Sequence, residues 1–302
     1  MNVSQLLSAF FRISDSPTPD KCCSKEVCFI NFLRVFNGLP ITVIADNVSK
    51  KTLDFISQPG ITVIETQLGN SGSFLHTLEL ASKATTMLAY FCEDDYIHRS
   101  ESPRLLVEGL RWSNYITLYD HPDKYLQQRG YGEVGRCLKT ETSHWRQTIS
   151  TTNTFAANLE FLRQDMDVFK KHSTGPVPND HAQWCDLAQR KRTLLVSIPG
   201  AAFNTHRVAE HSGFDWGASW VAKEVQQIAD MVKTSQEVFQ SPPNNVNFAP
   251  VSLTLPNGLP DLSTLGKTTI PALAIPNVEQ FHKQNIQKKE FEVQEGNFGL
   301  VK

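Results

Sequence analysis

Short apolar runs alternate with amphipathic stretches over the first 120 residues of the chain. Apolar and β-branched residues dominate five of these runs, which we expect to be buried strands: 5–13, 41–45, 61–65, 88–92 and 115–119. Helical spacing of apolar positions predicts four helices: 27–36, 49–57, 74–83 and 103–113. Strand–helix alternation of this kind is typical of an α/β fold with one mixed, mostly parallel sheet flanked by helices.

Polar residues follow each of these predicted strands. They are Arg12, Ser14 and Asp15; Asp46 and Asn47; the segment 69–73; Glu93, Asp94 and Asp95; and Asp120 with His121. Ligands bind beyond the carboxyl ends of the strands in such sheets, so we expect one polar ligand site at this rim.

The segment 69–73 reads Gly-Asn-Ser-Gly-Ser and precedes the helix predicted at 74–83. Glycines let the backbone approach a ligand, and a helix N-terminus offers N–H groups to phosphate or base. We therefore expect a binding loop here, with a plain strand–helix turn as the alternative. The segment matches neither the dinucleotide-binding glycine pattern nor the P-loop pattern.

Three adjacent carboxylates end the central apolar run. Glu93, Asp94 and Asp95 follow Leu88–Cys92 directly. Because the three charges repel one another, a divalent cation would offset their repulsion, and hard oxygen ligands suit Mg²⁺ or Mn²⁺. A solvated acidic turn is the alternative interpretation.

The segment 130–210 adds further candidate residues. The hydroxyl-rich run 148–155 favours a strand, and Trp145 and Trp184 are either stacking platforms for a ligand or core residues. Arg146 has the donor geometry to bind phosphate oxygens. Asp180 fits the N-cap of a helix at 182–190.

Beyond about residue 210 the pattern changes, so we expect three parts. Residues 1–210 form the main domain, 211–239 a helical segment, and 240–302 an extended or disordered tail rich in Pro, Asn, Ser, Gly and Thr.

Charge and composition exclude several classes of protein. A net charge of −2 and a pI near 6.5 give no electrostatic basis for nucleic-acid binding, and no apolar run is long enough for a transmembrane segment. The start of the chain has no signal-peptide pattern, and its six cysteines are scattered, so we expect thiols and a cytoplasmic location. Zinc binding by Cys22, Cys23 and Cys28 is the alternative.

The order of these parts resembles the GT-A-fold glycosyltransferases that use nucleotide-diphosphate sugars. The Glu93-Asp94-Asp95 string is similar to the Glu-Asp-Asp form of their acidic motif, found in some inverting members such as the N-acetylglucosaminyltransferases that build N-glycans. Residues 90–99 and 117–125 look like small glycosyltransferase domains of bacteria and large algal viruses, which implies a viral or bacterial origin. Here Glu93 replaces the first Asp of the commoner motif.

This resemblance implies that the segment 130–210 builds the acceptor side, with Trp145 and Trp184 as sugar-stacking candidates and Arg146 as a diphosphate contact. It also implies roles for other residues. Asp95 would ligate Mn²⁺ or Mg²⁺ at the diphosphate, with His206 as a further contact, and Glu93 and Asp94 would face the ribose or the donor sugar. Asp180 would be the base of an inverting reaction. The nucleoside pocket would be lined by Arg12, Ser14, Asp15, Asp46, Asn47, Asn70, Ser71, Gly72 and Ser73.

The implied function is the transfer of a sugar from a nucleotide-diphosphate donor, with a UDP-sugar expected, to a glycan hydroxyl. The alternative is another nucleotide-binding α/β protein, either a nucleotidyltransferase or an inactive binding module. Nucleotidyltransferases usually carry a glycine-rich first loop, and the segment 14–25 contains no glycine. For Asp46, a turn-forming role is the alternative to ligand binding.

Overall fold

The structure is a computed structural model that describes residues 3–17, 23–125, 135–205, 222–228 and 230. Its main sheet contains β1 (Leu7–Ser14), β2 (Ile41–Asp46), β3 (Ile61–Thr66), β4 (Leu88–Glu93), β6 (Tyr115–Thr117), β7 (Cys137–Lys139), β8 (His144–Gln147), β9 (Phe155–Asn158) and β10 (Leu194–Ile198). A second, two-stranded sheet pairs β5 (Tyr96–His98) with β11 (Ala202–Asn204). The helices are α1 (Val3–Leu6), α2 (Lys25–Val35), α3 (Lys50–Ile56), α4 (Gly69–Ser82), α5 (Ser102–Gly109), α6 (Leu159–His172), α7 (Asp180–Gln189) and the 3₁₀ helix η1 (Pro122–Tyr125).

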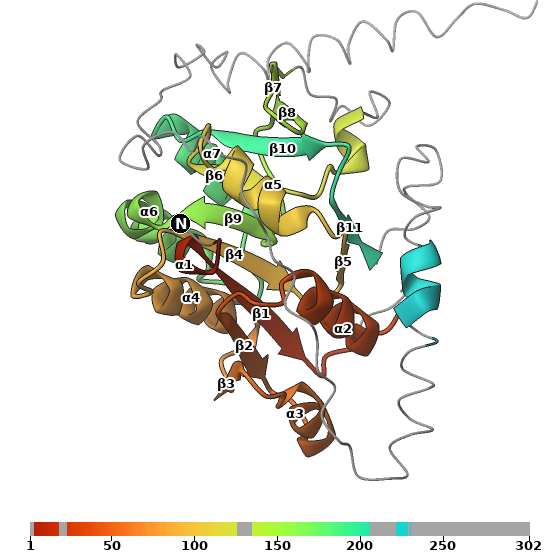
Figure 1. The fold of residues 1–302 in the computed structure, drawn as a ribbon. Coiled ribbons are helices and arrows are strands. Elements are labelled where there is room, and N and C mark those ends of the chain that lie inside the picture. The colour runs from red at the N-terminus through yellow and green to blue at the C-terminus, as the bar shows by residue number, and fades with distance from the viewer. Residues whose placement is uncertain (1–2, 18–22, 126–134, 206–221, 229, 231–302) are drawn as a thin grey trace, which may run out of the picture.

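The nine strands follow the order β3-β2-β1-β4-β9-β6-β10-β8-β7, from one end of the molecule to the other (Figure 1). The pairings β1–β2, β2–β3, β1–β4 and β6–β10 are parallel, whereas β8 and β9 run against their neighbours. The carboxyl ends of β1, β2, β4, β6 and β10 therefore share one rim. This mixed, mostly parallel α/β sheet confirms the predicted fold class.

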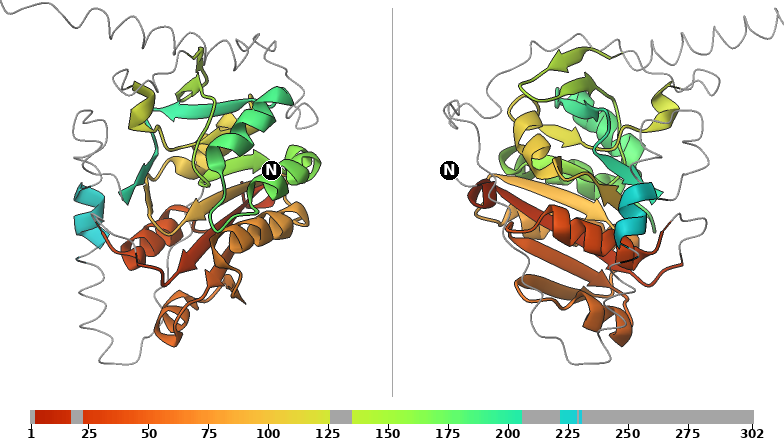
Figure 2. Two further views of the ribbon diagram at one scale, coloured as in Figure 1. Left: turned by 180° about the vertical axis from the view of Figure 1, so that it is seen from behind. Right: turned by 45° about the vertical axis from the view of Figure 1, so that its right-hand side comes forward.

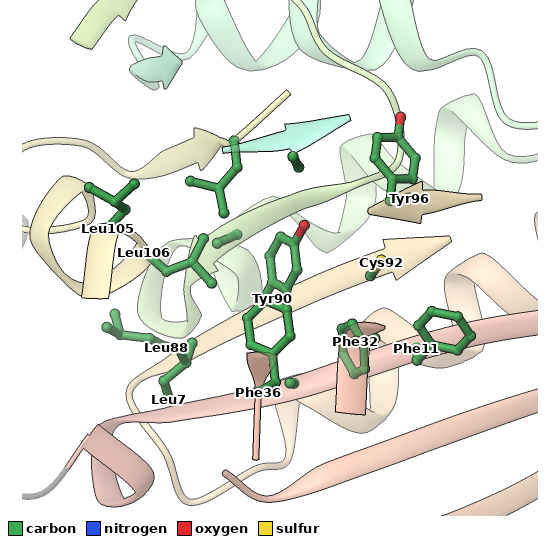
Figure 3. Packing of buried hydrophobic residues seen from close by; sticks show 14 of the residues in the cluster. Leu7, Phe11, Phe32, Phe36, Leu88, Tyr90, Cys92, Tyr96, Leu105 and Leu106 are labelled. Carbon is green, nitrogen blue, oxygen red and sulfur yellow. The ribbon is translucent and has the colours of Figure 1, made fainter. Parts of the chain in front are cut away.

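Helices cover both faces of the sheet because successive strand residues point to opposite sides. In β1, Phe11 packs against Phe29 and Phe32 of α2, while its neighbour Phe10 stacks on Phe91 in the other core cluster. Figure 1 views the face covered by α2 and α5, and the reverse view in Figure 2 brings α4 and α7 forward. Figure 3 shows the first of these two cores, where Phe32 and Phe36 lie along β1 and β4.

Side-chain caps fix where several helices begin. Ser24, Ser49, Asn158 and Asn179 each accept a hydrogen bond from a backbone N–H in the first turn of the following helix. The N-cap of α7 is therefore Asn179, so the prediction that Asp180 caps this helix is wrong; Asp180 is its first residue. Helix α4 begins after Leu68, which provides no side-chain cap.

Two other elements differ from expectation. The segment 69–73 forms the first turns of α4 rather than a loop, and Gly72 lies so close to Leu68 that a Cβ would stand 2.8 Å from the Leu68 Cβ. The hydroxyl-rich run 148–154 connects β8 to β9 without strand structure. Its hydroxyls bind backbone within the run and side chains outside it, as in the Thr148 bond to the Ser150 carbonyl (3.3 Å) and the Thr151–Thr117 bond (3.1 Å).

A buried polar group supports β5. Asn31 of α2 donates to the His98 carbonyl (3.0 Å) and accepts from the His98 N–H (2.7 Å), while the His98 Nε2 and the Tyr90 hydroxyl share a hydrogen bond of 2.7 Å. Of the predicted segment 211–239, residues 222–228 and 230 are described and helical. Glu224 in this helix accepts from Asn31 and Arg34.

The predicted tail at 240–302 and His206 lie outside the described residues. None of the helices within the described ranges is both long and apolar enough to cross a membrane.

We expect Leu106→Ala to lower the free energy of unfolding by about 2–5 kcal/mol, because it leaves a cavity in the core under α5. Leu106 is fully buried, whereas Leu68 is 52% exposed. The matched change Leu68→Ala should cost less than about 1 kcal/mol. Urea denaturation measures both values, and equal losses would contradict the assignment of this core.

Candidate functional site

The three acids predicted from the sequence leave the sheet at the middle of its polar rim. Glu93 ends β4, and Asp94 and Asp95 form the turn that leads into β5. The Glu93 N–H donates to the Thr154 hydroxyl at the start of β9 (3.1 Å). The turn is thus fixed between β1 on one side and β9 on the other.

Arg12 holds the first acid. It lies opposite Glu93 in the β1–β4 register, and its Nη2 is 2.7 Å from the Glu93 Oε1. Its Nη1 donates to the Asn70 carbonyl (2.8 Å) and to the Ser73 hydroxyl (3.2 Å). Arg12 therefore joins the acid motif to the first turn of α4, and its guanidinium also lies 5.3 Å from the ring centre of Phe74.

Lys25 holds the second acid. Its Nζ is 2.7 Å from the Asp94 Oδ2 and donates to the Ser14 carbonyl at 2.5 Å. The Ser14 N–H donates to the same carboxylate oxygen (3.0 Å). Sequence reasoning missed Lys25; the only available signal was a basic residue in the first turn of the helix that follows β1.

Residues from the end of β11 hold the third acid. The Asn204 amide donates to the Asp95 Oδ2 (3.3 Å), and the Thr205 N–H donates to the Asp95 carbonyl (2.8 Å). Asn204 was also missed, because a contact across 109 residues leaves no local pattern.

Burial shapes the electrostatics of this motif. Loss of solvation raises the pKa of Glu93 to about 7; the Arg12 charge opposes this shift, and the charges of Asp95, Asp94 and Asp180 add to it. Burial likewise raises the pKa of Asp94, against the lowering effect of Lys25. The charge of Asp180, the first residue of α7, thus contributes to the electrostatics of the acid motif.

The carboxylates at the ends of β1 and β2 hold neighbouring loops. Asp15 accepts from the Ser49 N–H and the Thr52 hydroxyl, each at 2.6 Å, and these hydrogen bonds, with that of Thr52 foremost, lower its pKa. Asp46 accepts from the Leu68 N–H (2.7 Å) and the Thr66 hydroxyl (2.8 Å). Both acids therefore order the rim, and a role in a nucleoside pocket stays a prediction.

Asn47 and the α4 residues complete this side of the rim. Asn47 has a positive φ of 52° and donates from its side chain to Asp46 (2.9 Å). Asn70 and Ser73 contact Arg12, whereas Ser71 is buried in the helix and its hydroxyl makes no hydrogen bond to any described residue.

Arg146 lies further along the sheet, on β8. Its Nη2 is 3.0 Å from the Asp120 Oδ1, and its guanidinium lies 5.3 Å from the ring centre of Tyr125. Arg146 thus already pairs with a carboxylate, and a diphosphate contact stays a prediction. Trp145 and Trp184 are 0% and 2% exposed, so both are core residues and the stacking interpretation is wrong.

Within the described residues, no three His, Cys, Asp or Glu side chains are grouped so that they could hold a metal ion. Asp95, the last carboxylate of the acidic turn, stays the predicted ligand for a metal ion.

The chain matches no sequence-family model and no curated protein sequence. Among solved structures, a nucleotidyl transferase from Methanothermobacter thermautotrophicus is 12% identical with a TM-score of 0.44, over 68% of this chain and 94% of that one. S. aureus TarS in complex with UDP is 13% identical with a TM-score of 0.42, over 63% and 57%. The galactosyltransferase LgtC with donor and acceptor sugar analogues is 10% identical with a TM-score of 0.37, over 63% and 72%. Likenesses this distant leave the function to the site residues.

The raised pKa of Glu93 predicts a pH-dependent stability. Between its ordinary pKa near 4.5 and about 7, the folded protein holds a proton that the unfolded chain has lost. The free energy of unfolding should therefore fall by about 1–3 kcal/mol as the pH rises through this window, with no further effect of Glu93 above it.

Denaturant unfolding between pH 4.5 and 8, without added divalent cations, measures this fall. Glu93→Gln should remove it, because the amide does not titrate but still accepts from Arg12. The control Glu79→Gln changes a carboxylate that is 43% exposed and should keep the wild-type slope. Parallel curves for wild type and Glu93→Gln would contradict the assignment.

Proposed function

We propose that this protein is a metal-dependent glycosyltransferase that moves a sugar from a nucleotide-diphosphate donor, expected to be a UDP-sugar, to a glycan hydroxyl. The proposal rests on one observation: Glu93, Asp94 and Asp95 leave the central strand at the rim where parallel strands end, with Arg12 and Lys25 beside them. Such a rim combines carboxylates with fixed cations and helix N-termini. This combination suits a ligand that has both phosphates and hydroxyls.

Asp95 fits the requirements of a Mn²⁺ or Mg²⁺ site. Mg²⁺ is commonly bound through one or two protein carboxylates together with substrate phosphates and water, so a single well-placed acid is sufficient on the protein side. The Asn204 and Thr205 contacts fix the orientation of Asp95. When bound, the cation offsets the charge that develops on the departing nucleoside diphosphate. His206 is proposed as a further ligand.

The donor side is proposed to lie between β1, β2 and the start of α4. Arg12 is held in one orientation by Glu93, Asn70 and Ser73, which favours a fixed hydrogen-bonding surface over a mobile one. The proposed surface continues at the ends of β1 and β2 with Ser14, Asp15, Asp46 and Asn47. In α4 the proposed neighbours are Ser71 and Gly72.

Asp180 is proposed as the base that takes the proton of the acceptor hydroxyl. As the first residue of α7 it lies at the positive end of a helix, where the ionised carboxylate that a base requires is favoured. Its Oδ1 accepts from the His181 N–H at 2.6 Å. Gln183, one turn further, donates to Asn153 (3.1 Å) and so ties α7 to the loop beside the acid motif.

We expect nucleotide sugars to stabilise the wild-type protein against heat when Mn²⁺ is present, by about 2.7 kcal/mol at a hundredfold excess over the dissociation constant. Asp95→Asn should remove this stabilisation. Asp54→Asn, which changes an acid 62% exposed on α3, should retain it. A panel of UDP-, GDP-, ADP- and dTDP-sugars, with and without chelator, provides the measurement.

Three results would overturn the proposal: no response to any donor, a response that survives chelation, or one that survives Asp95→Asn. Release of pyrophosphate from a nucleoside triphosphate would instead indicate a nucleotidyltransferase.

Asp180→Asn should reduce sugar transfer by about 10²–10⁴-fold while donor affinity stays within about twofold, because the base acts only in the chemical step. Asp186→Asn is the matched control on the same helix, since Asp186 contacts Lys171 (2.6 Å) and His172 (2.8 Å). NMR of the product reports the anomeric configuration. Equal losses in the two variants, or a product with retained configuration, would exclude Asp180 as the base of an inverting reaction.

A further inference from the structure

Two thiols lie side by side at the start of α2. The Sγ atoms of Cys23 and Cys28 are 3.7 Å apart, and both residues are in the thiol form. Cys28 is fully buried, whereas Cys23 is partly exposed. Relative to the cap Ser24, they occupy the positions immediately before the cap and four residues after it, where two apolar side chains commonly pack together.

Lys25, which forms an ion pair with Asp94, lies between these two cysteines in the sequence. Lys25 is the first residue of α2, and its ammonium group contacts both Asp94 (2.7 Å) and the Ser14 carbonyl (2.5 Å). The same thiols belong to a small apolar cluster with Val27, Ile97 of β5 and Ile228 of the helix at 222–228. A change at the thiols therefore reaches the acid motif directly, through one side chain.

We propose that Cys23 and Cys28 form a reversible redox site that controls the position of Lys25. With a low-molecular-weight disulfide as the oxidant, the Cys23 thiolate attacks one sulfur of that disulfide and releases one small thiol. The Cys28 thiolate then attacks the Cys23 sulfur of the mixed disulfide and releases the second small thiol. Two electrons and two protons thus pass from the protein to the oxidant, and one intramolecular S–S bond forms.

The expected structural effect follows from the helix start. Bonded sulfurs are about 2.05 Å apart, so the two Sγ atoms must approach one another. Cys28 is held in the helix by its N–H bond to the Ser24 carbonyl (3.1 Å), whereas Cys23 precedes the helix. Cys23 therefore moves toward Cys28, and we expect the Lys25 side chain at the helix start to shift with it. The Lys25–Asp94 ion pair weakens as a result, and, on the proposed function, donor affinity falls.

The test treats the full chain with oxidised glutathione over a range of glutathione ratios. Intact-mass analysis should show the loss of two hydrogen atoms, and peptide mapping should find Cys23 joined to Cys28. Cys22→Ser and Cys185→Ser should still form this bond, whereas Cys23→Ala and Cys28→Ala should not. A stable glutathione adduct on Cys23, or pairing of Cys28 with another cysteine, would overturn the site.

A second measurement tests the coupling to Asp94. Oxidation should lower donor affinity severalfold, reductant should restore it, and Lys25→Met should show the lower affinity in both redox states. If the disulfide forms and the affinity is unchanged, the control of Lys25 is refuted. If no donor binds in either state but the Cys23–Cys28 peptide is found, the proposed function fails and the redox site stands.

Discussion

The charge balance around Glu93 and Asp94 is the interaction on which this structure depends. Two carboxylates leave a buried strand side by side, and burial raises the pKa of each. Arg12 and Lys25 supply the opposing charges from β1 and α2, so the acid turn is stable only if both elements are in place. The β1–β4 register, which sets Arg12 opposite Glu93, is therefore as much an electrostatic requirement as a packing one.

The features that the sequence predicted correctly are those carried by local patterns. Buried parallel strands are continuous apolar runs, so β2 (Ile41–Asp46) and β4 (Leu88–Glu93) were found within a residue or two. Polar residues that directly follow such runs identified the rim, including Arg12 and the three acids. The helix α6 (Leu159–His172) was not predicted, although its apolar residues are regularly spaced.

The features that could not be predicted depend on tertiary contacts. The small residues at 69–73 have the composition of a loop, yet they form the start of α4. Two contacts support this helix start: Asp46 accepts a hydrogen bond from the Leu68 N–H, and Arg12 donates to the Asn70 carbonyl. Lys25 contacts Asp94 although 69 positions (94 − 25) separate them in the sequence. Asn204 contacts Asp95 across 109 positions. Trp145 carries no mark that distinguishes a core residue from a stacking surface until β8 is placed in the sheet.

The turn that carries the three acids is also supported by the strand β5 that follows it. This support explains why the polar side chain of His98 is buried in the core. His98 is fully buried, and burial lowers its pKa to about 3, so the ring stays neutral and shares a hydrogen bond with Tyr90. Asn31 binds both backbone groups of His98, which fixes β5 three residues after Asp95. A neutral, hydrogen-bonded His98 thus supports β5 without bringing a further charge into the core. The rigid strand β5 after the turn and the charge balance of Glu93 and Asp94 with Arg12 and Lys25 together give Asp95 one defined position.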